Sequence, residues 1–368
     1  MKRALGLIPL ILIAAAPLRP SEIPLTADAA VEVALSRAPA LKAARARAQA
    51  EKAAARAAGR PEEPKLIASH EAGHGDGRTQ MALTFDLWSL IGLSGRGKAS
   101  AAEFRRADAE LAETALALAA NTKSAVYAVQ AASATVVLLR ERAASNLEAG
   151  DAEQAAIDAE RAEADLEAAR SRLARLMRVP ANSGWWTAAT MARPADADPD
   201  TASLALLARE RRPSLKAALA AADAAEQRAR AWSSSEAGAF RVGVASEKMP
   251  DGSRLTGPAV EMDIPLFATM VPRAEAAEAR AAEAAAQADD LDAELTSQLE
   301  ILRARLIAAR RAAKRCREGL IPARESARGR DAAGALLAAR LEEISALKDY
   351  WTTYAALEGA VGGTWETK

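Results

Sequence analysis

Apolar side chains recur at every second position in two short segments of this chain, and each segment precedes a long stretch with a different period. The segments cover residues 65–87 and 240–264. Alternation of this kind predicts half-buried β-strands, with one apolar face and one small or polar face. The clearest alternating residues are Met81, Leu83, Phe85 and Leu87 in the first segment, and Phe240, Val242 and Val244 in the second.

Each alternating segment contains turn residues near its middle, which predicts two β-hairpins. In the first segment, Gly73, Gly75 and Gly77 separate the two arms, and in the second the turn is Pro250-Asp251-Gly252. Gly257-Pro258 interrupts the return arm of the second hairpin. Because proline donates no amide hydrogen, we expect a bulge or a bend there.

Beyond each hairpin the apolar spacing changes to sevens, fours and threes, which is typical of coiled-coil helices. We expect helices at about 100–148 and 152–178 after the first hairpin, and at about 273–328 and 336–357 after the second. The chain turns at Gly150 and again near 329–334. A helix of about fifty residues spans roughly 75 Å, far more than a globular domain requires.

One short phrase opens both halves of the chain and predicts an internal duplication. It reads Pro39-Ala-Leu-Lys-Ala-Ala in the first half and Pro213-Ser-Leu-Lys-Ala-Ala in the second. A short helix, a hairpin and a long helical pair follow each copy. We therefore expect two repeats, at 26–180 and 200–363, and a mainly α fold with a small β part.

Composition narrows the class of protein. Half of the 368 residues are hydrophobic, only 4% are aromatic, and 49 basic side chains balance 49 acidic ones. A net charge of zero gives no electrostatic basis for nucleic-acid binding.

The start Met1-Lys2-Arg3 followed by the apolar run 5–16 is typical of a secretory signal peptide, so we expect residues 1–16 to be removed on export.

The number of predicted strands is too small for a complete membrane β-barrel. Their alternation suits a membrane β-barrel in contact with lipid, yet four strands cannot close a barrel, and hydrocarbon does not tolerate an open sheet edge. If the strands enter a membrane, several chains must share one barrel. A soluble hairpin at the end of a helical bundle is the other interpretation.

The doubled phrase, the order of elements and two further phrases resemble the TolC-like outer-membrane efflux proteins. Those phrases are Leu255-Thr-Gly-Pro running into Met262-Asp-Ile-Pro-Leu-Phe, and Asp349-Tyr-Trp ending in Ala360-Val-Gly-Gly. The second-half phrases are most similar to the heavy-metal efflux branch. The resemblance implies a homotrimer in the cell outer membrane that extends into the periplasm, with twelve strands in one barrel and twelve helices in a tunnel. It also implies a periplasmic adaptor protein and an inner-membrane pump as partners, and export of small molecules or metal ions through a passive duct.

The helical turns are the candidate sites for gating and adaptor docking, because the tunnel tip lies there in the family. The residues concerned are Gly150, Asp151, Arg328, Gly329, Arg330, Asp331 and Gly334. Compared with the family pattern, each helical hairpin is shorter by roughly two heptads per arm. Two alternatives therefore remain open: a degenerate duct that no longer docks, and a periplasmic coiled-coil adaptor or scaffold.

The sequence predicts no enzyme, cofactor or metal site. Its only histidines, His70 and His74, have Asp76 nearby, but on a strand the two rings lie about 13 Å apart, too far for one ion. No nucleophile set, phosphate loop or paired-cysteine motif is present, and Cys316 is the only cysteine.

Overall fold

A computed structural model of the chain describes residues 25–365, apart from 62, 72–77, 88–89, 91, 146–148, 181–190, 197, 236–239, 250, 263–270 and 328–331. The expected signal peptide, the glycines of the first hairpin turn and the segment that follows Met262 lie outside these residues.

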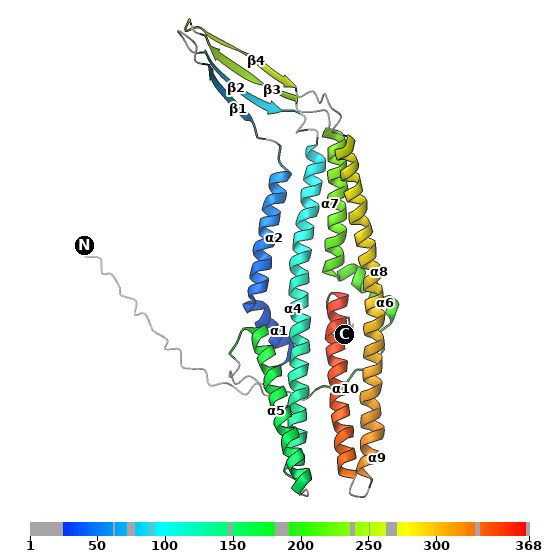
Figure 1. Ribbon diagram of the computed structural model, residues 1–368. Helices are drawn as coiled ribbons and strands as arrows, with labels where there is room; N and C mark the ends of the chain where they lie inside the picture. Colours follow the sequence, from blue (N-terminus) through cyan, green and yellow to red (C-terminus); the bar gives the residue numbers. More distant parts are fainter. Residues whose placement is uncertain are drawn as a thin grey trace, which may run out of the picture. The chain divides into compact units, whose positions relative to one another are not determined.

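The two halves repeat one order of elements, as the doubled phrase predicted (Figure 1). The first half consists of α1 (Ala27–Arg37), α2 (Pro39–Ala58), β1 (Lys65–Glu71), β2 (Arg78–Asp86), α4 (Leu93–Ala143) and α5 (Ala149–Met177). The second half consists of α6 (Thr201–Arg211), α7 (Pro213–Ser235), β3 (Phe240–Lys248), β4 (Arg254–Met262), α8 (Val271–Arg315), the π-turn η1 (Cys316–Leu320), α9 (Ile321–Glu325) and α10 (Ala332–Val361).

The short helix pairs are broken at the prolines of the doubled phrase. Ala38 and Arg212, the residues before Pro39 and Pro213, are extended, with ψ of 119° and 118°. A proline ring disfavours helical geometry in the residue that precedes it, whereas its own fixed φ suits the first helical position. Each phrase therefore ends one helix and starts the next.

The long helices differ from the expected bounds at their ends. The first ends at Ala143, and the next begins at Ala149, so Gly150 lies in the first turn of α5 rather than in the connection itself. The second long helix is not continuous to residue 328. It passes through η1, where the Ile321 amide donates to the Cys316 carbonyl, just before Pro322. Since Pro322 donates no amide hydrogen, the helical ladder shifts at this point.

The four strands form one antiparallel sheet in the order β1-β2-β3-β4 (Figure 1). The central pair, β2 and β3, joins the hairpin of the first repeat to that of the second, with Leu83 opposite Val244. The expected bulge at Gly257-Pro258 is wrong, because Ala245 pairs with Gly257 and Val244 with Pro258 without a slip. β4 is an edge strand of this sheet, and edge strands accommodate proline.

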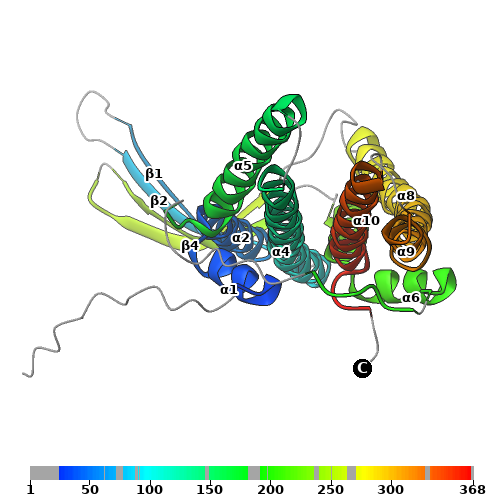
Figure 2. The same ribbon diagram turned by 90° about the horizontal axis from the view of Figure 1, so that it is seen from below.

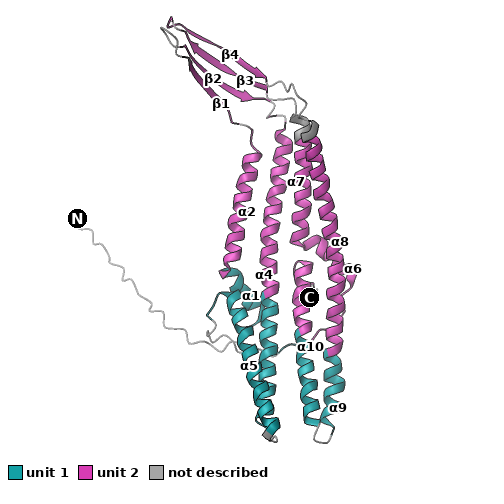
Figure 3. Cartoon of the chain, viewed as in Figure 1, with its two compact units in different colours: residues 1–36, 122–193, 313–348 teal, residues 37–121, 194–312, 349–368 magenta. Residues whose placement is uncertain are grey.

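The chain divides into two compact units, shown in different colours in Figure 3. Unit 1 comprises 1–36, 122–193 and 313–348, and unit 2 comprises 37–121, 194–312 and 349–368. Both units take segments from both repeats. The compact units therefore do not correspond to the two sequence repeats.

Unit 2 contains the sheet and a core built by the second repeat. Leu295, Leu299 and Leu306 of α8 pack with the end of α10 and with Leu204 of α6. These leucines follow the spacing of fours and threes that predicted a coiled-coil seam, and Leu299 is only 1% exposed. Tyr350, Trp351, Tyr354 and Trp365 extend this core as a chain of ring contacts.

Unit 1 contains parts of α4, α5, α9 and α10. In this unit α5 lies beside α4, and α9 lies beside α10 (Figures 1 and 2). The Arg140 guanidinium of α4 donates to Glu163 of α5 over 2.7 Å, and this hydrogen bond lowers the pKa of the Glu163 carboxyl. Leu166 and Leu173 of α5, which are seven residues apart as in a coiled-coil seam, are both buried, and Leu176 is half-buried.

Candidate functional site

One face of the sheet, the apolar face, is apolar over the part nearer the helices and polar toward the turns. In an antiparallel sheet, residues directly opposite each other share a face, so the register assigns every side chain. The apolar side chains of this face are Leu66 and Ala68 of β1, Met81, Leu83 and Phe85 of β2, Phe240, Val242 and Val244 of β3, and Pro258, Val260 and Met262 of β4. Its polar side chains are His70, Thr79, Ser246, Lys248, Arg254 and Thr256. Phe85 is 49% exposed and Val260 is 65% exposed, so much of the apolar surface is open in the single chain.

The opposite face of the sheet is polar or has small side chains. Thr84 and Arg241 are buried there, and the Arg241 guanidinium donates to Glu261 across the β3–β4 pair over 2.9 Å. Ala245, Ala259 and other small residues fill much of the remainder, whereas Ile67 and Leu255 are apolar exceptions. The sheet thus has the alternation of apolar and polar faces that is typical of membrane β-barrels.

Gly243 lies at the centre of the polar face. A Cβ atom at this position would lie 1.9 Å from the Leu83 carbonyl oxygen of β2, closer than any contact allows. Glycine inside a strand marks a close approach of backbone, and here the approach is the one that joins the two repeats. The sequence contains the signal, a lone glycine within an alternating segment, but does not say which strand approaches it.

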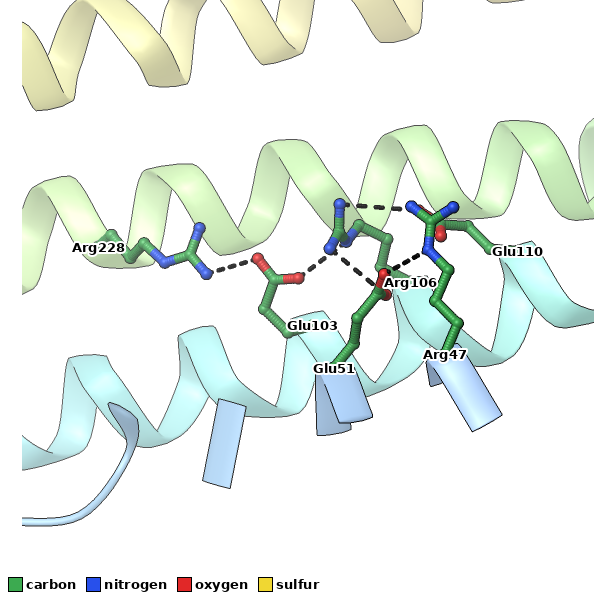
Figure 4. A network of polar contacts seen from close by, with 6 residues as sticks. All are labelled: Arg47, Glu51, Glu103, Arg106, Glu110 and Arg228. Atoms are coloured by element: carbon green, nitrogen blue, oxygen red, sulfur yellow. Dashed lines mark hydrogen bonds and ion pairs between the residues drawn. The ribbon is translucent and has the colours of Figure 1, made fainter. Parts of the chain in front are cut away.

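A network of six charged side chains holds α4 to the short helices of both repeats (Figure 4). Glu103 of α4 accepts from Arg228 of α7 over 2.6 Å and pairs with Arg106 over 2.8 Å. Arg106 in turn reaches Glu51 of α2 and Glu110, each over 3.6 Å, and Arg47 donates to Glu51 over 2.8 Å. The Glu103 side chain is 11% exposed, so its charge depends on these partners.

Arg212, in the break between α6 and α7, is a second polar junction in unit 2. Its guanidinium donates to Glu113 of α4 over 2.8 Å, to Ser214 over 2.9 Å, and to the Gly359 carbonyl of α10. Glu113 also accepts from the Ser214 amide over 3.2 Å. The junction thus binds three helices at the second copy of the doubled phrase. The pattern of residues does not reveal this junction, because charged residues at helical spacing are typical of solvated faces.

The expected tip residues are only partly within the described residues. Gly150 and Asp151 lie in the first turn of α5, and Gly334 lies in the first turn of α10. All three are exposed, and a Cβ on either glycine would meet nothing within 4 Å. Asp151 also suits a helix N-terminus electrostatically, which is a structural reason for its position. Arg328, Gly329, Arg330 and Asp331 lie outside the described residues.

An apolar groove of about 560 Å³ lies in unit 1. Its lining includes Val137 and Leu138 of α4, Met191, Ile321, and Ile344 and Leu347 of α10. Two ion pairs contribute to the same groove: Arg317 with Glu343 over 2.8 Å, and Arg340 with Glu325 over 3.1 Å. Val137 is half-exposed, so this part of the unit offers both apolar surface and paired charge.

The metal interpretation of the histidines can be examined at one residue. His70 lies on a strand, β1, as predicted, and its Nδ1 is 3.0 Å from Thr79 Oγ1 of β2. His74 and Asp76 lie outside the described residues. Within the described part of the chain, no group of three or more His, Cys, Asp or Glu side chains could hold a metal ion.

Solved structures with this fold are outer-membrane channels. The outer-membrane channel OprN matches with a TM-score of 0.71 at 18% sequence identity, over 92% of this chain and 90% of that one. CusC, described as forming a transmembrane channel, matches with a TM-score of 0.69 at 16% identity, over 92% of both chains. The open state of the MtrE outer membrane channel of Neisseria gonorrhoeae matches with a TM-score of 0.68 at 17% identity, over 92% and 89%.

No protein-family model and no curated protein sequence matches the chain. At such low identities the matched structures show the fold, and they extend over nearly the whole of both chains. The resemblance inferred from the repeated phrases is confirmed at that level.

Proposed function

We propose that this chain, which has the fold of the TolC-like outer-membrane efflux channels, is one subunit of a trimeric exit duct of a tripartite efflux or secretion system. The duct lies in the outer membrane and extends into the periplasm. The single observation that carries the proposal is the sheet: four strands with one exposed apolar face and two open edges, β1 and β4.

Lipid contact explains the apolar face, and a shared barrel explains the edges. Hydrocarbon does not tolerate unpaired strand edges, so β4 of one copy must pair with β1 of the next. Three copies supply twelve strands, which is the number that the resemblance implies. The repeats 26–180 and 200–363 each contribute one strand pair and one helical hairpin to this assembly.

Export through such a duct is passive, since the driving free energy comes from an inner-membrane pump that a periplasmic adaptor links to the tips. Cargo is a small molecule or a metal ion. A duct positions and shields its cargo without bond chemistry, which agrees with a chain that has no recognisable catalytic motif. The apolar groove and exposed tips of unit 1 offer surfaces for the adaptor.

Assembly is the first test. We expect the full-length chain to be recovered from outer-membrane fractions as a trimer that dissociates to monomers only on heating in detergent. Gel mobility with and without boiling measures this directly. Recovery as a soluble periplasmic monomer would contradict the duct and favour the scaffold alternative.

Docking needs a separate test, because a degenerate duct would still assemble. A cysteine introduced at Asp151 should crosslink to a co-expressed adaptor, whereas one at Arg47, far along the chain on α2, should not. Native Cys316 is 2% exposed, and burial raises the pKa of its thiol, so it stays unreactive at neutral pH. Trimers that assemble but never crosslink from Asp151, or from a second cysteine at Asp331, would favour the degenerate duct.

A further inference from the structure

A row of polar side chains that includes two cations, Lys248 and Arg254, crosses all four strands at the edge of the apolar face. The register pairs His70 with Thr79, Thr79 with Lys248, and Lys248 with Arg254. These four residues therefore lie on one face and in one row across the strands, and each such row is called a level. We call them the basic row. His70, Lys248 and Arg254 are exposed, and no member is acidic.

A mixed level separates the basic row from the apolar part of the face. One step nearer the helices, on the same face, the level consists of Ala68, Met81, Ser246 and Thr256, and the next consists of Leu66, Leu83, Val244 and Pro258. In the mixed level the Thr256 hydroxyl donates to the Ser246 hydroxyl over 3.3 Å. Levels on one face of a strand are about 7 Å apart, so the face changes from apolar to basic over about 14 Å.

The row lies at the turn end of both hairpins. β3 ends at Lys248 and β4 begins at Arg254, and the turn between them is closed by the Met249 amide donating to the Ser253 carbonyl over 2.9 Å. Asp251, the acidic residue of this turn, accepts from the amide and the hydroxyl of Ser253. The helices follow the opposite end of the sheet, so in a duct the basic row faces the outer leaflet.

We infer that the basic row binds the phosphate groups of an anionic outer-leaflet lipid, as a rim of cations above the apolar band. This inference rests on the proposed function, because it requires the apolar face to be in lipid. Lys248 and Arg254 supply the charge, and the His70 ring, whose Nδ1 is engaged by Thr79 Oγ1 over 3.0 Å, offers its Nε2 for a hydrogen bond. Cations near an anionic lipid surface strengthen binding by about fivefold each.

Native mass spectrometry of the delipidated trimer in neutral detergent tests the inference, with bis-phosphorylated lipid A as the probe. We expect the double variant Lys248→Gln, Arg254→Gln to bind it roughly twenty-five-fold more weakly than the unchanged trimer. Lipid A without its phosphates should bind the two trimers equally. Inorganic phosphate should not compete at equal concentration, which distinguishes a lipid headgroup from a free phosphate site.

Lys65→Gln is the matched control, since Lys65 is an exposed cation of β1 on the polar face near the helix end. It should leave lipid binding unchanged. A double variant that forms trimers and binds phosphorylated lipid as tightly as the unchanged protein overturns the inference and leaves the duct intact. If the unchanged chain forms no membrane trimer, the duct and the basic row are both contradicted.

Discussion

We expect Gly243→Ala to lower the yield of the proposed outer-membrane trimer severely. The new Cβ would lie 1.9 Å from the Leu83 carbonyl oxygen and 2.7 Å from Thr84 Cα, so β2 and β3 must separate. Because that pair alone connects the two hairpins, a local clash divides the sheet in two. A clash with backbone destabilises by about 3 kcal/mol, which corresponds to roughly a hundredfold loss of assembled trimer. Quantitative gels of outer-membrane fractions, with and without heating, measure the loss.

Gly257→Ala is the control for this prediction. Gly257 lies on the same polar face, on β4, and a Cβ there meets nothing within 4 Å. We expect this variant to assemble as the unchanged chain does. Normal trimer yield from Gly243→Ala would show that the β2–β3 approach is looser than described, and equal losses from both variants would indicate a general sensitivity of the sheet.

Arg212→Met has the second largest expected effect. Methionine keeps the length of the side chain but removes donors to Glu113, Ser214 and the Gly359 carbonyl. The Arg212 and Glu113 side chains are 17% and 29% exposed, so the carboxylate is left with poor solvation. Breaking a pair in such surroundings destabilises by about 2–4 kcal/mol. A lower midpoint in thermal unfolding, followed by circular dichroism of the helices, measures the effect.

Arg209→Met provides the comparison for Arg212, one helical turn earlier on α6. Arg209 donates twice to Asp292, over 2.9 and 2.7 Å, and this hydrogen bonding lowers the pKa of Asp292. Its side chain is 55% exposed, however, and exposed ion pairs contribute little. We expect an almost unchanged midpoint. Equal shifts for both variants would contradict a special role of the Arg212 junction.

Local pattern was sufficient where each element depends on its own residues. The breaks at Pro39 and Pro213 follow from the proline ring, and the Thr26 hydroxyl caps α1 by accepting from the Ala29 amide over 3.2 Å. The alternation of Met81, Leu83 and Phe85 predicted the apolar face of β2. These features involve neighbours only a few residues apart.

At Gly257-Pro258 the local sequence pattern led to the wrong prediction of a bulge. Both residues disfavour a strand interior, but an edge strand has one side without ladder partners within the chain, and the register passes through unchanged. The position of β4 at the edge is a property of the whole sheet. The same limit applies to Gly243, whose partner strand lies in the other repeat.

By itself, the sequence determined an internal duplication. Each repeat consists of a short broken helix, a hairpin with alternating apolar and polar residues, and a pair of long helices. It also determined that the hairpin strands have one apolar face, and that four such strands cannot close a membrane barrel alone. Only the tertiary structure decided that β2 meets β3, that Gly243 makes this meeting possible, and that Arg212 and Glu103 bind helices of both repeats. The reason is physical. The spacing of apolar residues depends on residues that are close in the sequence, whereas a strand register or an ion pair depends on two segments that are distant in the sequence and meet only in the folded chain.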